Sequence, residues 1–303
     1  MQNNKPIWFE DKTTSANDDT YQTIKHNKVE SDTVEINIGQ QPKAKIMVCT
    51  PCHSDVSMHY TQAVLKFQQQ CLMNNIMVSF TMLKSSLVTQ GRNLCVSAFF
   101  EEKVKHDYLL FIDSDIDFEF GTIMKMVKAD KDIIAYPYPL KDINWEKIQK
   151  KIEHRNVTDP KEYSRFGYTW PIKIENRDSF EVFDEVAEVT HAPTGCMLIK
   201  RSVFETMMEK LPHLKISQPT IVNGKTYDKP YFYNFFDTHH DPETKRYYGE
   251  DFGFCIRWNK LGGKCHILIS DDFISHVGEY KYTGRLKDDL ESIKNVDEDI
   301  KNK

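Results

Sequence analysis

YLLFIDSD, residues 108–115, is an apolar run that ends abruptly on two carboxylates one residue apart. A short apolar run bounded by charge is typical of a buried strand, and α/β folds bind ligands at the carboxyl ends of their strands. On an extended backbone, residues two apart point to the same face, so Asp113 and Asp115 can share a hard divalent cation. Two solvated aspartates after a strand would give the same pattern, so the neighbouring segments have to distinguish the two interpretations.

Short apolar runs alternate with amphipathic stretches on both sides of this segment. We expect strands at 45–50, at 77–83 and in the run that ends at 113, with helices at 58–74 and 88–105 between them. This strand-helix-strand-helix-strand order predicts an α/β, Rossmann-like fold, in which helices flank a mainly parallel central sheet. A further strand is expected at 132–136.

The rest of the chain suggests one domain at 44–285, with a polar N-terminal extension at 1–43 and a charged C-terminal tail at 286–303. Its first half is 44–140, and the charged, weakly periodic segment 141–188 indicates an insertion or flap with a short helix at 145–153. Its second half is 189–285. There we expect a strand at 189–200, a helix capped by Ser202, a helix at 249–261 and a last strand at 273–276.

The composition is that of an ordinary globular protein. The 303 residues are 40% hydrophobic and 28% charged, enough to bury a sizeable core. A net charge of -5 gives no general attraction for nucleic acid or for an anionic membrane. Residues 1–41 lack the apolar core of a signal peptide, and no stretch approaches the roughly 18 apolar residues of a membrane span. We therefore expect a cytoplasmic protein without a membrane span.

The seven cysteines, in a chain without a secretory signal, indicate reduced thiols. In the cytoplasm, the glycosylation sequon at 156–158 would stay unused. CTPCH, residues 49–53, has the spacing of covalent haem attachment and includes a dithiol motif. Haem attachment normally requires export, and a thioredoxin-like unit would be far shorter than this chain. We therefore interpret this segment as a strand that ends in a loop.

Several short segments together resemble the GT-A fold of nucleotide-sugar-dependent glycosyltransferases, with a D-x-D motif as in family 2, over about residues 44–285. The matching segments are CTP at 49–51, GRN at 91–93, FIDSDI at 111–116, PTGCMLI at 193–199, GEDFGFCIRW at 249–258 and HVG at 276–278. Each is weak alone, but their order and spacing match as well. The resemblance implies transfer of a sugar from a nucleoside diphosphate, with a UDP-hexose expected, to a hydroxyl acceptor.

The resemblance also implies a metal site. In such enzymes the D-x-D carboxylates bind Mn²⁺ or Mg²⁺, and several members add a late histidine, so Asp113, Asp115 and His276 are the expected ligands. The imidazole nitrogen favours Mn²⁺. A fixed cation suits this reaction, because negative charge develops on the departing diphosphate. Asp117 continues the spacing of aspartates two residues apart, and we interpret it as a solvated residue or as one that supports the metal ligands.

Glu250 and Asp251 begin a predicted helix, where the helix dipole favours ionised carboxylates. Plain helix capping explains such a pair equally well. The resemblance instead makes Asp251 the catalytic base and Glu250 an acceptor-binding group. The Glu-Asp and Arg-Trp pairs favour inversion at the anomeric carbon, whereas a late histidine ligand is commoner in members that retain the configuration. Arg257 and Trp258 resemble the pair that helps to hold the acceptor and the diphosphate. Position 254 is Phe, so the Q-x-x-R-W motif of processive polymerases is absent.

The remaining candidates concern the donor and the acceptor. The positions that the resemblance assigns to donor binding are Thr50, Pro51, His53, Arg92, Asn93, Ser114 and Gly195. A guanidinium can pair bidentately with phosphate, and Gly195 is expected to shape a tight loop beneath the donor sugar. The aromatic segment 227–248, with His239 and His240, is an expected acceptor wall. The acidic residue that contacts uracil in many members is not evident unless Asp55 fills that place.

Two other functions remain open. A nucleotidyltransferase or sugar-nucleotide pyrophosphorylase also has paired aspartates, but it would carry a glycine-rich, basic loop after the first strand, which CTPCHS at 49–54 lacks. A non-catalytic sugar- or metal-binding module could keep the same fold. The presence of Asp113, Asp115 and Asp251 together favours an enzyme. Its acceptor can be a glycan, a lipid-linked sugar, a protein side chain or a hydroxylated base, and the net negative charge counts against DNA.

Overall fold

The computed structural model describes residues 41–279 except 156–158, 175–179, 218–219, 223–224 and 228. Most of the predicted N-terminal extension, the charged tail and the sequon at 156–158 lie outside the described residues. Within the part that the structure describes, no helix combines the length and the apolarity needed to cross a membrane.

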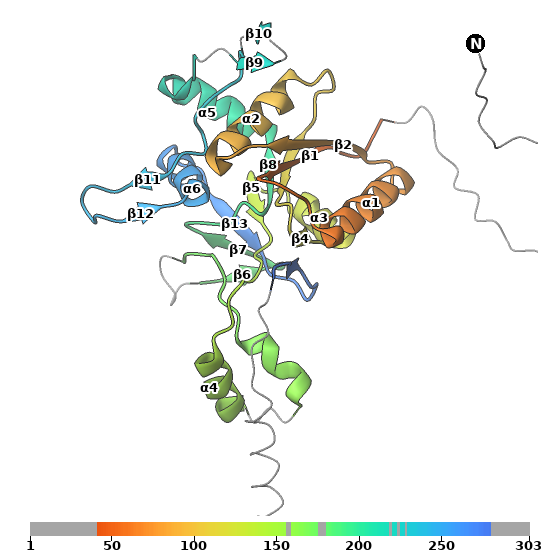
Figure 1. The fold of residues 1–303 in the computed structure, drawn as a ribbon, viewed down its shortest axis with the longest axis vertical. Coiled ribbons are helices and arrows are strands. Elements are labelled where there is room, and N and C mark those ends of the chain that lie inside the picture. The colour runs from red at the N-terminus through yellow and green to blue at the C-terminus, as the bar shows by residue number, and fades with distance from the viewer. Residues whose placement is uncertain are drawn as a thin grey trace, which may run out of the picture. The chain divides into compact units, whose positions relative to one another are not determined.

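Among the described residues, eight strands form one central sheet in the order β2-β1-β3-β8-β5-β13-β7-β6 (Figure 1). The strands are β1 (Lys45–Cys52), β2 (Met77–Lys84), β3 (Tyr108–Ile112), β5 (Ile133–Ala135), β6 (Val182–Phe183), β7 (Val186–Val189), β8 (Cys196–Lys200) and β13 (Cys265–Leu268). β7 and β8 run against the other six. The predicted mainly parallel α/β sheet is confirmed, with β8 inserted antiparallel between β3 and β5.

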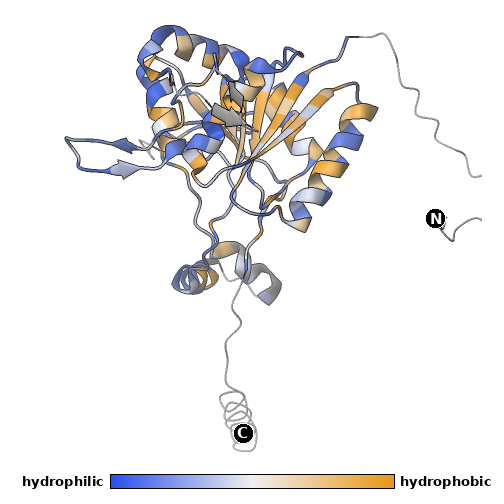
Figure 2. Cartoon of the chain, turned by 45° about the horizontal axis from the view of Figure 1, so that its top comes forward, coloured by the Kyte–Doolittle hydropathy of each residue, from blue (hydrophilic) through white to orange (hydrophobic). Residues whose placement is uncertain are grey.

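Helices cover both faces of this sheet (Figure 1). They are α1 (Met58–Met73), α2 (Val88–Glu101), α3 (Phe120–Lys128), α5 (Arg201–Lys210) and α6 (Glu250–Lys260). Apolar side chains of α2, α5 and α6 share one core cluster, and those of α1 and α3 share the other. β1 supplies both clusters, Met47 to the first and Ile46 to the second, because neighbouring strand residues face opposite sides. Figure 2 shows how strongly apolar residues concentrate in the central strands.

Several sequence-based expectations need correction. The sequence analysis did not identify α3 or β13, and α2 ends at Glu101 instead of residue 105. The single strand expected at 189–200 is two strands, β7 and β8, separated by the turn at Thr194 and Gly195. Ser202 does not cap α5, since the helix begins at Arg201 and Lys200 occupies the N-cap without a side-chain hydrogen bond.

The helix expected at 145–153 is α4 (Trp145–Arg155), which lies beside the 3₁₀ helix η1 (Pro160–Phe166) in the 141–188 segment. The backbone N–H of Asn144 donates to Gly167 O at 3.1 Å, and Lys147 Nζ donates to Tyr168 O. A side chain at residue 167 would collide with Ile148, because an added Cβ would lie 2.8 Å from Ile148 Cδ1. These contacts join α4 and η1 into one small unit.

The part of the chain that the structure describes also contains the 3₁₀ helix η2 (Pro212–Leu214) and three two-stranded ribbons. The ribbons are β9 (Thr220–Val222) with β10 (Lys225–Tyr227), β11 (His239–His240) with β12 (Tyr247–Tyr248), and β4 (Ile116–Asp117) with β14 (Ser275–His276).

All seven cysteines are buried free thiols. Cys49 and Cys52 both lie in β1, and their Sγ atoms donate to the carbonyl oxygens of Cys95 and Thr50. Burial raises the pKa of both thiols, the opposite of what a reactive thiolate requires. The segment therefore carries inert cysteines, and β1 continues through Cys52, beyond the strand end expected at residue 50.

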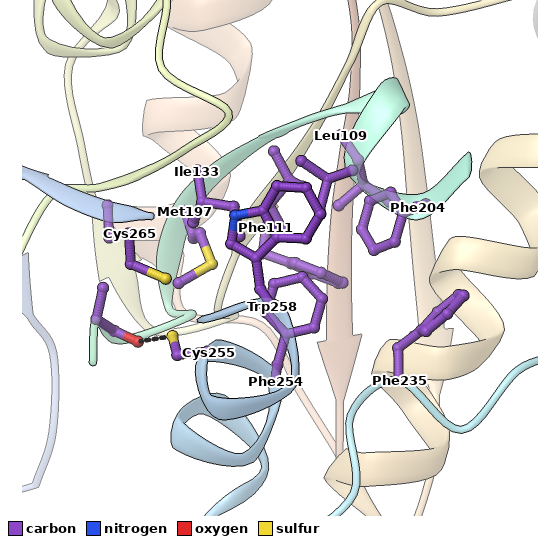
Figure 3. Packing of buried hydrophobic residues seen from close by; sticks show 14 of the residues in the cluster. Leu109, Phe111, Ile133, Met197, Phe204, Phe235, Phe254, Cys255, Trp258 and Cys265 are labelled. Carbon is purple, nitrogen blue, oxygen red and sulfur yellow. Dashed lines mark hydrogen bonds between the residues drawn. The ribbon is translucent and has the colours of Figure 1, made fainter. Parts of the chain in front are cut away.

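Aromatic side chains fill the core between α6 and the sheet. Figure 3 shows Phe254, Cys255 and Trp258 of α6 grouped with Phe111 and Met197 of the sheet. Phe254 also stacks on Phe236, with ring centroids 4.3 Å apart. This packing fixes α6, and with it the two carboxylates that begin the helix.

Phe254→Ala should lower the free energy of unfolding by about 3–5 kcal/mol, because it leaves a cavity in this closely packed cluster. Phe183→Ala is the matched control, since the Phe183 side chain is 85% exposed, and it should change stability by less than about 0.5 kcal/mol. Urea unfolding of both variants measures the difference. Equal losses would show that the aromatic cluster does not anchor α6.

Candidate functional site

The predicted carboxylates lie at the edge of the sheet where β3 ends. Asp113 follows the last residue of β3, and its backbone N–H donates to Gly195 O, at the start of β8, at 2.9 Å. The ribbon of β4 and β14 pairs His276 with Ile116, and Val277 N donates to Asp115 O at 2.8 Å. Two segments far apart in the sequence thus bring Asp113, Asp115 and His276 to one edge.

Arg92 forms the centre of this edge. It lies in the second turn of α2, and its side chain is only 3% exposed. Nη2 lies 3.0 Å from Asp113 Oδ1 and donates to Oδ2 at 3.2 Å, while Nε donates to Glu250 Oε1 at 3.2 Å. Burial alone would lower the pKa of Arg92, but the carboxylates of Asp113 and Glu250 outweigh burial and raise it. Arg92 is therefore a permanent cation between two acidic residues.

The Asp115 carboxylate contacts two other groups, His276 and Lys141. His276 Nε2 lies 3.4 Å from Asp115 Oδ2, and Lys141 Nζ donates to the same oxygen at 2.5 Å. Burial alone would raise the pKa of Asp115, but the hydrogen bonds from His276 and Lys141 lower it to about 2. His276 Nδ1 is 2.9 Å from Pro139 O, which fixes the ring so that Nε2 faces the carboxylate.

Two of the three residues expected to bind a metal, Asp115 and His276, lie close together in this arrangement. Two ligands at about 2.1 Å from one octahedral or tetrahedral cation lie roughly 3 to 3.5 Å apart, the separation of Asp115 Oδ2 and His276 Nε2. A ligating histidine commonly has its other ring nitrogen on a backbone carbonyl, as His276 does. Asp113 does not complete the set, since its carboxylate faces Arg92. Within the described ranges, no three potential ligands gather around one point, so the residues fit a cation that takes its other ligands from substrate and water.

Glu250 and Asp251 begin α6, after Gly249 at the N-cap, as predicted. They differ in environment. Glu250 is held by Arg92, whereas Asp251 Oδ1 accepts the backbone N–H of Phe252 at 2.7 Å. Burial and the neighbouring Glu250 raise the pKa of Asp251 to about 6. Asp251 is therefore the carboxylate of this site that can exchange a proton near neutral pH.

Tyr138 is a member of the site that the sequence analysis missed. Its ring meets His276 edge-on, with centroids 5.0 Å apart, and its hydroxyl lies against Gly195. An added Cβ at residue 195 would be 2.5 Å from that hydroxyl oxygen, so only glycine allows this contact. Burial, followed by the charge of Asp113, raises the pKa of Tyr138. The Pro-Tyr-Pro sequence directly after a predicted strand end was the available signal.

The predicted nucleotide-binding positions at and after the end of β1 divide into buried and exposed residues. Thr50 is fully buried, and its hydroxyl is 2.5 Å from that of Tyr60. Pro51 packs against Gly91, where an added Cβ would lie 3.2 Å from Pro51 Cβ. His53 and Asp55 are exposed, and the carbonyl of half-buried Ser114 accepts a hydrogen bond from Ser57 N at 2.8 Å. The segment 53–57 is thereby anchored beside the two aspartates.

The structure does not bring Asn93, Arg257 or Trp258 into contact with the carboxylates. Asn93 Oδ1 accepts the N–H of Phe236, and Arg257 donates to the carbonyl oxygens of Phe235 and Asp237. Trp258 lies in the core with 7% exposure. Residues 257 and 258 lie two turns after 250 and 251, about 10 Å further along the axis of α6, where Arg257 and Trp258 pack the helix against the domain.

Aromatic rings of the segment expected as an acceptor wall gather at the ribbon of β11 and β12. Tyr248 stacks on His191 with centroids 5.6 Å apart, and His239 stacks on Tyr248 at 6.2 Å. These rings line a cavity of about 450 Å³ together with Ile256 and Lys260 of α6. Burial, followed by the charge of Lys173, lowers the pKa of His191 to about 4.

Comparison with known proteins gives little further guidance. No protein-family model matches the chain, and no curated protein matches its sequence. A197 from STIV is similar in structure, with a TM-score of 0.38 and 16% identity over 80% of this chain and 98% of that chain. 4-Diphosphocytidyl-2C-methyl-D-erythritol synthase from Anaerococcus prevotii DSM 20548 has a TM-score of 0.28 and 12% identity over 58% and 79% of the two chains. Similarity at this level carries no functional argument.

Arg92→Met should lower the free energy of unfolding by about 3–5 kcal/mol, because it leaves Asp113 and Glu250 without their shared counter-ion. Arg246→Met, at an exposed arginine, should cost less than about 0.5 kcal/mol. Chemical denaturation compares the two variants. If the Arg92 variant is as stable as the control, the buried ion bridge does not hold this edge together.

The raised pKa of Asp251 predicts a pH-dependent stability. Its folded-state pKa of about 6 lies above the value of about 3.9 for an unfolded aspartate, so protonation contributes stability that is full below pH 4 and lost as pH rises through 6. Asp251→Asn stays neutral at every pH. The melting temperature of this variant relative to wild type should therefore rise between about pH 4 and 7.

Paired thermal melts across that pH range test this prediction. Asp55→Asn, at an exposed aspartate, is the control and should give a constant difference from wild type. A constant difference for Asp251→Asn as well would mean that the Asp251 carboxyl has no raised pKa in the folded protein.

Proposed function

We propose that this protein is a metal-dependent glycosyltransferase that moves a hexose from a nucleoside diphosphate, with UDP the first candidate, to a hydroxyl acceptor. The observation that carries the proposal is the contrast between two aspartates at one sheet edge. The pKa of Asp115 is lowered to about 2 and that of Asp251 is raised to about 6. Carboxyl groups whose environments separate their pKa values in this way are suited to different catalytic tasks.

Asp115 supplies the permanently charged carboxylate. Together with His276 it would hold Mn²⁺, or Mg²⁺, beside the donor diphosphate. When bound, the cation would neutralise the negative charge that develops on the leaving nucleoside diphosphate. Pro139 O holds the His276 ring, and Val277 N holds the Asp115 backbone, so the two ligating atoms keep their relative positions.

Asp251 supplies the base. Its carboxylate would take the proton of the acceptor hydroxyl while that oxygen attacks the anomeric carbon opposite the leaving diphosphate. The new glycosidic bond forms as the bond from carbon to phosphate oxygen breaks, which inverts the configuration. A pKa near 6 suits this step, because the carboxylate is ionised at neutral pH and still binds a proton well.

Glu250 and Asp113 receive supporting roles in this scheme. Both carboxylates are bound to Arg92, so we propose that they position α6 and the β3 end and do not bind acceptor or metal. The first half of the domain would bind the donor, and the ribbon of β11 and β12 would face the acceptor. Its aromatic rings suit stacking on a sugar.

Neither alternative has comparable support. The loop after β1 is not rich in glycine or basic residues, so a nucleotidyltransferase would lack its phosphate loop. A binding module has no need of a carboxyl group whose pKa lies close to neutral. We also propose that the protein works in the cytoplasm, where its seven buried thiols would remain reduced.

Release of the nucleotide from UDP-, GDP-, ADP- and CMP-sugars, with Mn²⁺ or with a chelator, tests the proposal. One donor should be hydrolysed slowly in the presence of the metal, and Asp115→Ala should abolish that release. Asp117→Asn, at a half-exposed neighbour on β4, should retain it. Metal-independent release, or an active Asp115→Ala variant, would contradict the metal-dependent mechanism.

Asp251→Asn should reduce the rate of sugar transfer by about 10²- to 10⁴-fold once an acceptor is found, because it removes the base. Donor binding, measured by calorimetry, should be unchanged. The wild-type kcat/KM should rise with pH through about 6, as Asp251 loses its proton, and then level off. A variant that keeps its transfer rate would exclude Asp251 as the base.

A further inference from the structure

Lys141 occupies an unusual position next to the proposed cation site. It lies between β5 and α4, and its Nζ donates to Asp115 Oδ2 at 2.5 Å. The same oxygen faces His276 Nε2 at 3.4 Å. The Lys141 and Asp115 side chains are 41% and 32% exposed, so both are open to solvent. One carboxylate oxygen, Asp115 Oδ2, therefore contacts an imidazole and an ammonium group at the same time.

The ammonium and a divalent cation cannot both occupy this place. A cation held between His276 Nε2 and Asp115 Oδ2 would contact the oxygen that Lys141 now binds, and the two positive charges would repel each other at that distance. Exposed ion pairs contribute little stability, so the bond between Lys141 and Asp115 is easily exchanged. Binding of the cation should therefore displace the Lys141 ammonium from Asp115.

The backbone around Lys141 limits how far its ammonium can go. Pro139 O contacts His276 Nδ1 at 2.9 Å, and Leu140 N donates to Thr169 O at 2.8 Å. The methylene groups of Lys141 also pass over Gly278, where an added Cβ would lie 2.7 Å from Lys141 Cδ. Because its base is fixed in this way, a displaced ammonium group stays near the cation and near whatever anion the cation binds.

We propose that Lys141 is a diphosphate-binding residue that exchanges Asp115 for the donor diphosphate when the divalent cation binds. This inference rests on the proposed function. An ammonium group on a flexible stem is a common phosphate ligand that acts as a point charge. The exchange also balances charge, because the two positive charges of the cation enter together with the two negative charges of the donor diphosphate. The Lys141 ammonium still pairs with one negative group, the diphosphate in place of Asp115. Lys141 would then help to stabilise the leaving group.

Calorimetry on Lys141→Met measures both halves of the exchange. Because the variant lacks the ammonium group that competes for Asp115, Mn²⁺ in the absence of nucleotide should bind it about threefold to tenfold more tightly than it binds wild type. With saturating Mn²⁺, the tightest-binding of UDP, GDP, ADP and CDP should bind about tenfold more weakly. Lys141→Arg keeps the charge, and it should restore nucleotide binding to within about threefold of wild type.

Lys264→Met is the matched control, since Lys264 pairs with Glu188 at 2.6 Å on an exposed surface, and it should change neither affinity. If wild type binds a nucleotide and Lys141→Met binds Mn²⁺ and that nucleotide equally well, the role of Lys141 is wrong while the proposed function stands. If wild type binds Mn²⁺ but none of the four nucleotides, the proposed function fails, and the diphosphate half of this inference fails with it.

Discussion

The buried guanidinium of Arg92 is the contact on which the arrangement of the site depends. Its partners come from β3 and from the start of α6, and Glu250 lies 158 residues away in the sequence. Removing an arginine and two carboxylates from water is costly, and only close pairing offsets that cost. The pairing therefore fixes three elements relative to one another. It also gives Asp113 and Glu250 one shared cation.

Asp115 and Asp251 differ because their surroundings differ. Asp115 has an ammonium and an imidazole as neighbours, so its charge is stabilised even though burial opposes ionisation. Asp251 is buried next to another carboxylate, so its charge is disfavoured. Their neighbours come from the segment after β5, from β14 and from the helix start. The fold thus gives one residue type two chemical characters, as the proposed transferase, with separate metal and base carboxylates, would require.

Much of the architecture could be predicted from local patterns. The β1-α1-β2-α2-β3 order, the placement of Asp113 and Asp115 after a strand and the start of α6 at Glu250 follow from apolar periodicity and helix-start signals. The patterns failed at short elements. α3 has nine residues and β13 has four, too few for a clear period. Ser202 was misjudged as a cap because the first residue of a helix next to a strand is set by the strand end.

The sequence by itself determined which chemical groups are present and at which strand and helix ends they lie. Only the tertiary structure decided which of them meet. It paired Asp113, an expected metal ligand, with Arg92, and it buried Trp258 in the core. It also brought Tyr138 and Lys141 to the site. The physical reason is that protonation and ligation depend on burial and on nearby charge. Both are set by segments that are distant in the chain and become neighbours only when the sheet and its helices pack together.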